Sequence, residues 1–371
     1  MKRTEMFFRG FAWLATLVIA TSSAGHAGES PKNIIFIIGD GMGIGAITAA
    51  RCIGPGENGG LTLDGMPVTG LVKTHSESAL VTDSAASGTA LATGHKTLNG
   101  RIATDSQGRP LESLAELAGK MGKSSGIITT DLLTGATPAV FFSHAEGRSL
   151  QDDIALQLPS SPVTVAMGGG KENFIPPAAG KGGRKDGADV VAMARGKGFD
   201  VCFDSASMRG SKSDRLLGLF SFSADGPTLE AMLRSTLSIV SKNPKGFFVM
   251  AESCLPDKGG HGNDIATSFE GVKALDDALR SALEFAKNDG RTLVVVTADH
   301  ETGGLAVLDR DAMNPKLKPG WLCGHHTGNM VPVYAFGPAS EKFSGTHDNT
   351  DLPKIMAELW GKKLGAQEAA R

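Results

Sequence analysis

The segment NIIFII, from Asn33 to Ile38, is a continuous apolar and largely β-branched run, and Gly39-Asp40-Gly41 follows it directly. A run without polar alternation is typical of a strand buried on both faces of a parallel sheet. The carboxyl end of such a strand is where α/β proteins place their ligands, so Asp40 is a candidate site residue. An Asp-Gly pair also forms tight turns, and this segment alone does not separate the two interpretations.

Two more segments repeat the pattern of a buried strand that ends in polar side chains. GFFVMA, from Gly246 to Ala251, precedes Glu252, and TLVVVTA, from Thr292 to Ala298, precedes Asp299-His300. Further strands are predicted at 125–129, 163–167 and 332–337, and helices at 111–121, 189–195, 227–242, 265–287 and 352–360, with a short helix from Pro138 to Arg148. The sequence predicts an α/β fold with a largely parallel central sheet flanked by helices on both faces.

The N-terminus predicts export. Lys2, Arg3 and Arg9 precede an apolar run at 11–20, and small residues fill 21–27, which is the pattern of a secretory signal cleaved after Ala27. The run is too short to span a bilayer, although an uncleaved anchor is the alternative. No other stretch is apolar enough for a membrane helix and no linker divides the remainder. We therefore expect residues 28–371 to form a single domain in the periplasm or outside the cell.

The charge balance excludes one class of partner. Lys and Arg number 37 and Asp and Glu 39, whereas a nucleic-acid-binding protein would show a clear basic excess. Four cysteines in an exported chain allow three disulfide pairings or free thiols. The composition thus argues against nucleic acid as a partner and leaves the state of the cysteines open.

Metal-ligand side chains gather at one edge of the predicted sheet. Carboxyl ends of parallel strands share an edge, so the side chains that follow them should meet there: Asp40, Glu252, Asp299 and His300. Asp257 and His261 are one helical turn apart and can face one ion, and GHHTG at 324–328 supplies further imidazoles. Carboxylates with imidazoles suit zinc, and carboxylates with a threonine hydroxyl suit magnesium.

The segment VTDSAASGT, from Val81 to Thr89, predicts a helix that begins with a serine. Asp83 is a good N-cap, and Ser84 would lie in the first turn, where free N–H groups and the positive end of the helix dipole favour an anionic ligand. A serine hydroxyl is a weak nucleophile unless a base or a metal activates it, and no GxSxG elbow surrounds Ser84. Taken alone, the segment is better explained as a capped, alanine-rich core helix.

Together these motifs resemble the alkaline phosphatase family. VTDSAASGT is similar to the family's nucleophile signature, IGDGMG at 38–43 to its first metal-binding strand, TADHE at 297–301 to its second, and Glu252, Asp257, Lys258 and His261 to its central loop. The motifs occur in the family's order from Asn33 to about Leu352, and the region 151–222 fits less well. The resemblance implies the family's fold and a metal-dependent phosphomonoester hydrolase.

The resemblance also implies where ions and substrate bind. Two zinc ions and one magnesium ion would surround the nucleophile Ser84. The first zinc would be held by Asp257, His261 and His326, the second by Asp40, Asp299 and His300, and magnesium by Asp40, Thr137 and Glu252. Arg148 would clamp two phosphate oxygens, and Lys258 would help to bind substrate. His325 competes with His326, but the family's His-Thr-Gly pattern favours the histidine directly before Thr327.

The implied reaction is hydrolysis of small-molecule phosphomonoesters through a phosphoserine at Ser84, with release of inorganic phosphate and with activity that rises toward alkaline pH. A related phosphodiesterase or sulfatase uses similar chemistry, but Ser84 lacks the Cys-or-Ser-x-Pro-x-Arg context of sulfatases. A catalytically silent exported protein that binds metal or phosphate is the alternative from another class. The sequence is compatible with a homodimer.

One position departs from the family pattern. Family members usually carry Asp or His two residues before the threonine of the third metal site, and this chain has Gly135 there. With less negative charge, the magnesium site should be weak and filled mainly at high magnesium. Asp131 lies too far back in the loop to be expected as a replacement. Gly135→Asp is then expected to lower the magnesium concentration needed for full activity.

Two expectations concern side chains outside the ligand sets. Cys254 and Cys323 each lie a few residues from a ligand of the first zinc, so the resemblance brings their loops together and a disulfide is expected, provided that the Cα atoms come within about 7 Å. Cys52 and Cys202 are expected to be buried free thiols. The basic cluster of Lys181, Arg184 and Lys185 is interpreted as a solvated loop.

Overall fold

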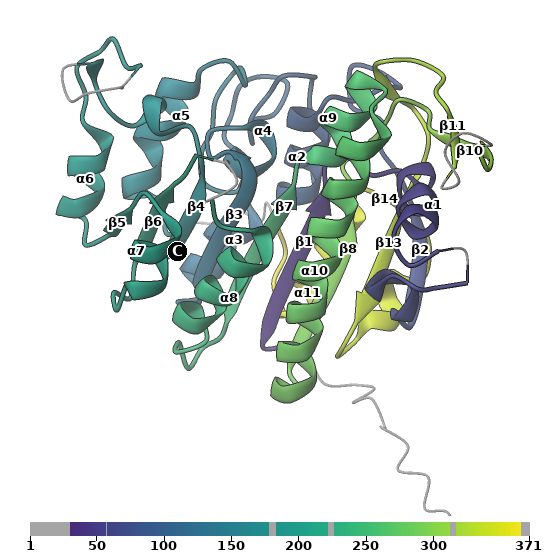
Figure 1. Ribbon diagram of the computed structural model, residues 1–371. Helices are drawn as coiled ribbons and strands as arrows, with labels where there is room; N and C mark the ends of the chain where they lie inside the picture. Colours follow the sequence, from purple (N-terminus) through teal and green to yellow (C-terminus); the bar gives the residue numbers. More distant parts are fainter. Residues whose placement is uncertain (1–29, 57, 178–182, 222–225, 312–316, 365–371) are drawn as a thin grey trace, which may run out of the picture.

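The computed structural model describes residues 30–56, 58–177, 183–221, 226–311 and 317–364, so the predicted signal at 1–27 lies outside the described residues. A ten-stranded sheet forms its centre (Figure 1). The strands of this sheet are β1 Asn33–Gly39, β2 Val68–Lys73, β3 Ser124–Leu132, β4 Val165–Gly169, β5 Asp200–Cys202, β6 Leu216–Leu219, β7 Phe247–Ser253, β8 Thr292–Thr297, β13 Val331–Phe336 and β14 Gly345–Asp348. Their order is β14-β2-β13-β8-β1-β7-β3-β4-β6-β5.

Most neighbouring strands of this sheet are parallel, as predicted. Within the described part of this ten-stranded sheet, only β13 runs antiparallel to its neighbours, which are β8 and β2. β1 comes first in the chain but lies in the middle of the sheet, where Ile34 is paired with Phe248 of β7 on one side and with Leu293 of β8 on the other. The prediction of an α/β fold with a largely parallel sheet is confirmed.

Helices cover both faces of the sheet (Figure 1). One face carries α1 (Ile44–Ile53), α8 (Leu229–Val240) and α10 (Ile265–Asp289), and the other carries α2 (Ser84–Thr93), α3 (Leu114–Lys120) and α11 (Asp351–Leu359). The shorter helices are α4 (Ala136–Ala139), α5 (Gln151–Gln157), α6 (Val190–Gly196), α7 (Ser205–Gly210) and α9 (Leu255–Gly262). Two small sheets pair β9 (Glu301–Thr302) with β12 (His326–Thr327) and β10 (Ala306–Asp309) with β11 (Lys318–Gly320). Within the described ranges, no helix is long and apolar enough to cross a membrane.

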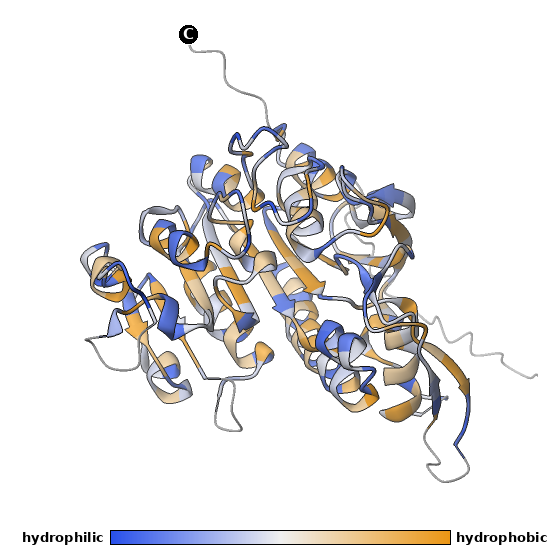
Figure 2. Ribbon diagram, turned by 90° about the horizontal axis from the view of Figure 1, so that it is seen from above, coloured by the Kyte–Doolittle hydropathy of each residue, from blue (hydrophilic) through white to orange (hydrophobic). Residues whose placement is uncertain are grey.

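The apolar runs of the sequence form the interior of the sheet. The side chains from Ile34 to Ile38 are fully buried, and Figure 2 shows the strands largely in orange, whereas the helices carry both orange and blue. Amphipathic helices of this kind bury one face against the sheet and leave the other in water. The long helix α10 is capped at both ends, because Asp264 accepts a hydrogen bond from the Ala266 N–H and Gly290 follows the last turn with a positive φ of 70°.

The structure contains elements that the sequence does not predict, among them the helices α1, α5 and α7, and it lacks one predicted helix. The sequence pattern does not predict β2, β5, β6 and β14, which have only three to six residues each. The predicted helix from Pro138 to Arg148 is wrong, because α4 ends at Ala139 and Arg148 lies in a loop. Ala145 forms an isolated bridge with Ile102, and the Arg148 N–H donates to the carbonyl oxygen of Gly100 at 2.8 Å. These contacts hold the backbone out of a helical conformation.

Arg184 is fully buried, which contradicts the interpretation of its segment as a solvated loop. Its guanidinium donates to the carbonyl oxygens of Asp152 at 2.7 Å and Asn173 at 2.9 Å, and its Nε donates to Asp186 Oδ1 at 3.0 Å. The neighbouring Lys185 is exposed, and the first lysine of the cluster lies outside the described residues. One arginine thus joins three segments of the region that resembles the family least.

Arg184→Ala should lower the free energy of unfolding by about 3–5 kcal/mol, because it removes a buried cation and leaves its acceptors without their donor. Chemical denaturation measures this change. The exposed neighbour provides a matched control, and Lys185→Ala should change the same quantity by less than about 0.5 kcal/mol. Equal effects of the two substitutions would show that Arg184 does not join these segments.

Candidate active site

The predicted strand-end residues lie together at one end of the sheet. β1, β7 and β8 are parallel neighbours, and Ile38 is paired with Glu252 on one side and with Thr297 on the other. Asp40 and Asp299, two residues further along their strands, therefore lie at the same edge. The helices α2, α4 and α9 lie at this end as well, near the top of Figure 1.

The residues of the first predicted zinc group come from two segments. Asp257 and His261 lie one turn apart on α9, and His326 belongs to β12. The Nε2 atoms of His261 and His326 are 3.1 Å apart, and each lies 3.4 Å from Asp257 Oδ1. Donor atoms about 2 Å from a tetrahedral zinc ion are about 3.3 Å from one another, so these three atoms have the spacing of zinc ligands. The competing His325 is exposed.

The second predicted zinc group lies next to the first. His300 Nε2 is 3.4 Å from Asp40 Oδ1 and 3.2 Å from Asp299 Oδ2. The His300 ring also stacks on the His326 ring, with centroids 3.6 Å apart, so the two groups are in direct contact through their imidazoles. His300 and Asp299 are completely buried, whereas the His261 side chain of the first group is 43% exposed, so the second group is the one shielded from bulk water.

Three buried oxygen atoms of these residues lack a hydrogen-bond partner within the described residues: Asp40 Oδ1, Asp299 Oδ2 and Thr137 Oγ1. A buried polar atom without a partner is costly, and native proteins rarely leave one unsatisfied. Carboxylate, hydroxyl and imidazole groups are the ligands that zinc and magnesium take in proteins. The side chains present therefore fit divalent cations.

Burial and repulsion between like charges raise the pKa of two acids at this edge of the sheet, Asp40 and Glu252. Burial raises the pKa of Asp40 well above its usual range, and the negative charge of Asp299 raises it further. Burial and the charge of Asp131 raise the pKa of Glu252 to about 8. Burial lowers the pKa of His300, which favours the neutral imidazole that binds metals. Divalent cations would offset this accumulation of negative charge.

Ser84 is the first residue of α2 and is buried beside the second group. Its Oγ lies 3.1 Å from His300 Nε2. Asp83 caps the helix, because its carboxylate accepts a hydrogen bond from the Ala86 N–H at 2.9 Å. Every residue of α2 is buried, so the helix belongs to the core as its composition suggests. Its first hydroxyl nevertheless faces a candidate metal ligand at the positive end of the helix dipole.

The predicted magnesium group combines Asp40, which follows β1, with Glu252 of β7 and Thr137 of α4. Glu252 is 1% exposed, and one of its oxygens accepts a hydrogen bond from the Thr129 hydroxyl. The Thr137 hydroxyl lies near Glu252 and acts to lower the pKa of that carboxyl, but it has no hydrogen-bond partner of normal geometry within the described residues. Gly135 is the N-cap of α4 and carries no side chain toward these groups.

Each predicted substrate-binding cation is paired with an acid. Arg148 Nη1 lies 3.3 Å from Asp83 Oδ2, and the Arg148 side chain is 45% exposed. It is thus held next to the N-cap that precedes Ser84, with part of its guanidinium open to solvent. Lys258 lies on α9, and its Nζ is 2.8 Å from Asp131 Oδ1. Both cations are thus held in place by ion pairs with aspartates.

The prediction overlooks Thr302, which connects the two zinc groups. Its hydroxyl donates to Asp257 Oδ1 at 2.6 Å and lies 3.2 Å from His300 Nδ1. Such contacts fix the orientation of ligands. Thr302 lies two residues after His300, and a period of two places both on one face of extended backbone, which is the signal that could have identified it.

The predicted disulfide between Cys254 and Cys323 is wrong, because all four cysteines are free. Cys254 is buried and its thiol donates to the Thr130 carbonyl oxygen at 3.4 Å, whereas the Cys323 thiol donates to a carbonyl in its own loop at 3.3 Å. The loops of the first zinc group do converge, but the two thiols contact different backbone segments. The expectation of a buried free thiol is confirmed for Cys202, whereas Cys52 is free but only partly buried.

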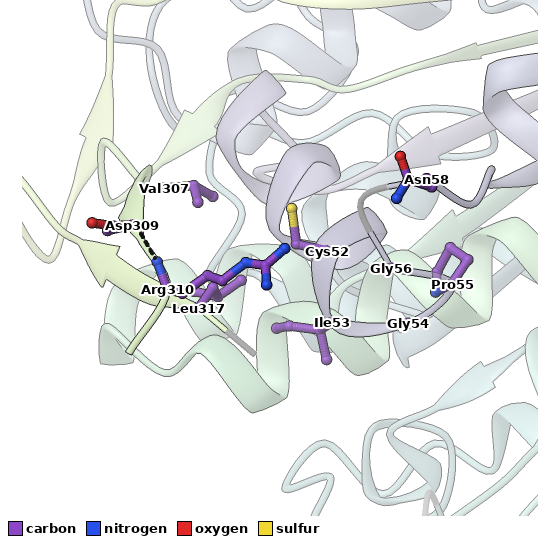
Figure 3. Close-up of a pocket in the computed structure, with 10 residues that line it drawn as sticks. All are labelled: Cys52, Ile53, Gly54, Pro55, Gly56, Asn58, Val307, Asp309, Arg310 and Leu317. Atoms are coloured by element: carbon purple, nitrogen blue, oxygen red, sulfur yellow. Dashed lines mark hydrogen bonds between the residues drawn. The ribbon is translucent and has the colours of Figure 1, made fainter. Parts of the chain in front are cut away.

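A cavity of about 670 Å³ lies elsewhere, between the end of α1 and the hairpin of β10 and β11 (Figure 3). Its lining includes Cys52, Val307, Arg310 and Leu317, and Figure 3 shows Arg310 beside the end of α1. None of the predicted site residues lines it. The volume of a cavity is therefore not what marks the candidate site in this protein.

The fold and the paired metal-ligand groups define the class of metal-binding phosphoric monoester hydrolases. A match to the alkaline phosphatase family covers residues 31–316 and 306–361, and the chain belongs to this family. It is 31% identical to alkaline phosphatase 4 of Bacillus subtilis (strain 168), over 88% of each chain. It is also 31% identical to the alkaline phosphatase of Escherichia coli (strain K12), over 90% of this chain and 86% of that protein.

Solved structures agree with this assignment. The alkaline phosphatase of the Antarctic bacterium TAB5 is 31% identical and superposes with a TM-score of 0.81, over 89% of this chain and 98% of the TAB5 chain. A mutant of the TAB5 enzyme, in which a histidine is replaced by aspartate, has Mg bound in its M3 site and matches equally well, with 31% identity, a TM-score of 0.81, and coverage of 90% and 99%. The chain therefore shares its fold with enzymes of the family over nearly its whole length.

Proposed function

We propose that this alkaline phosphatase hydrolyses small-molecule phosphomonoesters with Ser84 as its nucleophile, two zinc ions and one magnesium ion. The observation that carries the proposal is the position of Ser84 Oγ, 3.1 Å from His300 Nε2 and at the N-terminus of α2. A hydroxyl there meets both a metal-ligand group and an electropositive helix end. The distances within the two donor groups support the assignment of three ligands to each zinc ion.

The ligand sets follow from these groups. One zinc ion would be held by Asp257, His261 and His326, the other by Asp40, Asp299 and His300, and the magnesium ion by Asp40, Thr137 and Glu252. When bound, such ions lower the pKa of oxygen nucleophiles and stabilise negative charge on departing oxygens. The unpartnered buried oxygens of Asp40, Asp299 and Thr137 support these assignments.

The protein groups around Ser84 have distinct tasks. Ser84 Oγ would attack phosphorus, so that an Oγ–P bond forms while the bond from phosphorus to the alcohol oxygen breaks. The proton that Ser84 gives up balances the one that the departing alcohol gains. The free N–H groups at the start of α2 and the guanidinium of Arg148 face the phosphate oxygens and hold them for in-line attack. A water molecule would then attack phosphorus, its oxygen bonding to phosphorus while the Oγ–P bond breaks, and a proton of that water would restore the Ser84 hydroxyl. Lys258, held by Asp131, adds positive charge for the bound substrate.

Arg148→Ala should weaken the binding of inorganic phosphate about tenfold to a hundredfold, because charged hydrogen bonds contribute roughly 1.5–3 kcal/mol each. Product inhibition by phosphate measures this affinity directly. Arg109 offers a matched control, since it is also paired with an aspartate and is more exposed, at 76%. Arg109→Ala should leave phosphate inhibition unchanged, and an unchanged affinity in Arg148→Ala would mean that Arg148 is not the phosphate clamp.

Two other functions use overlapping chemistry. A related phosphodiesterase would need a second ester group in the site, and a catalytically silent exported protein would bind metal or phosphate without turnover. Chromogenic substrates separate the three functions: a phosphomonoester and a diester with the same leaving group, assayed with zinc and magnesium present. We expect turnover of the monoester to exceed that of the diester. Faster diester hydrolysis, or no hydrolysis with both metals bound, would exclude the proposal.

The proposal extends to cellular context. We propose that the signal at 1–27 directs export and is then cleaved. The mature protein, residues 28–371, would be a single catalytic domain in the periplasm or outside the cell, with no membrane span after cleavage. The pattern of basic, apolar and small residues before Ala27 supports export. N-terminal sequencing of the mature protein tests the cleavage site.

A homodimer is part of the proposal, and light scattering of the metal-loaded protein tests it.

A further inference from the structure

We propose that Asp131 supplies to the third metal site the carboxylate that position 135 lacks. The inference rests on the proposed function, because it concerns the magnesium group of that site. It replaces the expectation of a weak site, which assumes that Asp131 lies too far back in the loop. Asp131 lies four positions before Gly135 in the chain, but the loop between them folds back on itself.

The backbone of this loop brings the Asp131 side chain to the place of a residue 135 side chain. The Gly135 N–H donates to the Leu132 carbonyl oxygen at 2.8 Å, which closes a tight turn after β3. A Cβ atom added to Gly135 would lie 3.5 Å from Asp131 Oδ2. The carboxylate of Asp131 thus lies beside the volume that an acid at position 135 would enter.

The same turn is incompatible with an unmoved side chain at position 135. An added Cβ would lie 2.8 Å from the carbonyl oxygen of Leu132, which is closer than real Cβ contacts and involves backbone rather than a flexible side chain. The turn would have to open before Gly135→Asp could place its carboxylate. Glycine at 135 and aspartate at 131 are therefore complementary choices, and we no longer expect Gly135→Asp to improve magnesium binding.

Two hydrogen bonds tie Asp131 to the candidate magnesium ligands. The Asp131 N–H donates to Thr129 Oγ1 at 2.8 Å, and the Thr129 hydroxyl in turn donates to Glu252 Oε2. Thr137 is 1% exposed, and its hydroxyl has no hydrogen-bond partner in the part of the chain that the structure describes. This unpartnered hydroxyl is an independent sign that the buried group binds a ligand. Asp131 is thereby fixed relative to the oxygen atoms that would hold the ion.

The two carboxylate oxygens of Asp131 have different surroundings. Oδ1 accepts from Lys258 Nζ at 2.8 Å, which orients the carboxylate, and Oδ2 lies on the side of Gly135. The Asp131 side chain is 32% exposed, so water reaches it. Magnesium keeps several water molecules when it binds to protein, and a carboxylate that accepts hydrogen bonds from such water strengthens the site. We assign this role to Asp131 and the role of anchoring its carboxylate to Lys258.

The test is the magnesium affinity of Asp131→Asn, measured by calorimetric titration of protein that retains its zinc. The substitution keeps the shape of the side chain and removes its charge, and the affinity should fall about tenfold to a hundredfold. Asp277→Asn is the matched control, because Asp277 pairs with Lys273 at a similar exposure on α10, 28% and 53%. It should leave magnesium affinity unchanged, and the thermal midpoints of both variants check that they are folded.

Lys258→Met separates a direct role of Asp131 from a role through Lys258. If Asp131 contributes its own charge, Lys258→Met should lower the magnesium affinity less than Asp131→Asn does, because it frees the carboxylate but keeps its charge. Native affinity in Asp131→Asn, or an equal loss in Asp131→Asn and Lys258→Met, would overturn the inference. Zinc content and phosphorylation of Ser84 are recorded on the same samples. Their absence from the unmodified protein would count against the proposed function instead of against Asp131.

Discussion

Ser84→Ala should lower kcat for phosphomonoesters by about 10³-fold or more, because it removes the atom that forms the covalent intermediate while the metal groups and Arg148 remain. Acid quenching of the unmodified enzyme with labelled phosphate should trap one labelled peptide, and mass spectrometry should map the label to Ser84. The variant should carry no label and should keep its zinc content.

Ser87 provides the control for this substitution. It also lies on α2, one turn further on, and its hydroxyl donates to the carbonyl oxygen of Asp299 at 2.6 Å. Ser87→Ala should lower stability, yet retain the label on Ser84. Label on a different residue of the unmodified protein, or full turnover in Ser84→Ala, would contradict the assignment of Ser84 as the nucleophile.

Removal of metal should have the second large effect. Chelation should reduce activity to the level of Ser84→Ala, and added zinc with magnesium should restore it. The thermal midpoint should also fall by several degrees, because a ligand at a thousand times its Kd stabilises a folded protein by about 4 kcal/mol per site. The buried, mutually repelling acids Asp40, Glu252 and Asp299 lose their counter-charge at the same time.

Elemental analysis before and after chelation connects the two readouts. Activity and thermal midpoint should both follow bound zinc across a series of partly loaded samples. Ser84→Ala serves as the control here, since it should show the same fall in thermal midpoint upon chelation with no activity to lose. Retained activity in protein free of zinc and magnesium would contradict the metal-dependent mechanism.

The sequence predicts the site largely because strand ends in a parallel sheet have a fixed geometry. Asp40, Glu252 and Asp299 each follow a long apolar run, and long runs identify buried strands reliably. Once the strands are known to be parallel neighbours, the convergence of these acids follows without knowledge of any loop. The short strands β5 and β6 give no comparable pattern, because three or four residues cannot display a period.

Contacts that depend on the path of a loop could not be predicted in this way. Asp131 is four positions before Gly135, and the sequence does not show that the chain turns back between them. Only the closed turn after Leu132 brings the Asp131 carboxylate beside position 135. The sequence suggests that Arg184 is solvated, because it shows the charge of the side chain. It does not show the carbonyl groups that accept hydrogen bonds from the buried guanidinium. For Cys254 and Cys323 the sequence predicts a contact that does not form. Their loops converge on one candidate ion site, but the two thiols donate to different acceptors.

The central position of β1 has a consequence for how the protein is made. β1 is synthesised first, yet its pairing partners Phe248 and Leu293 follow more than two hundred positions later. The apolar run from Ile34 to Ile38 therefore has no sheet to join until most of the chain has emerged. Pairings of such long range make folding slow and leave apolar strands open to aggregation in the meantime. Biogenesis of this enzyme thus depends on keeping its first strand apart from other chains, and coexpression with a holdase chaperone should raise the soluble yield.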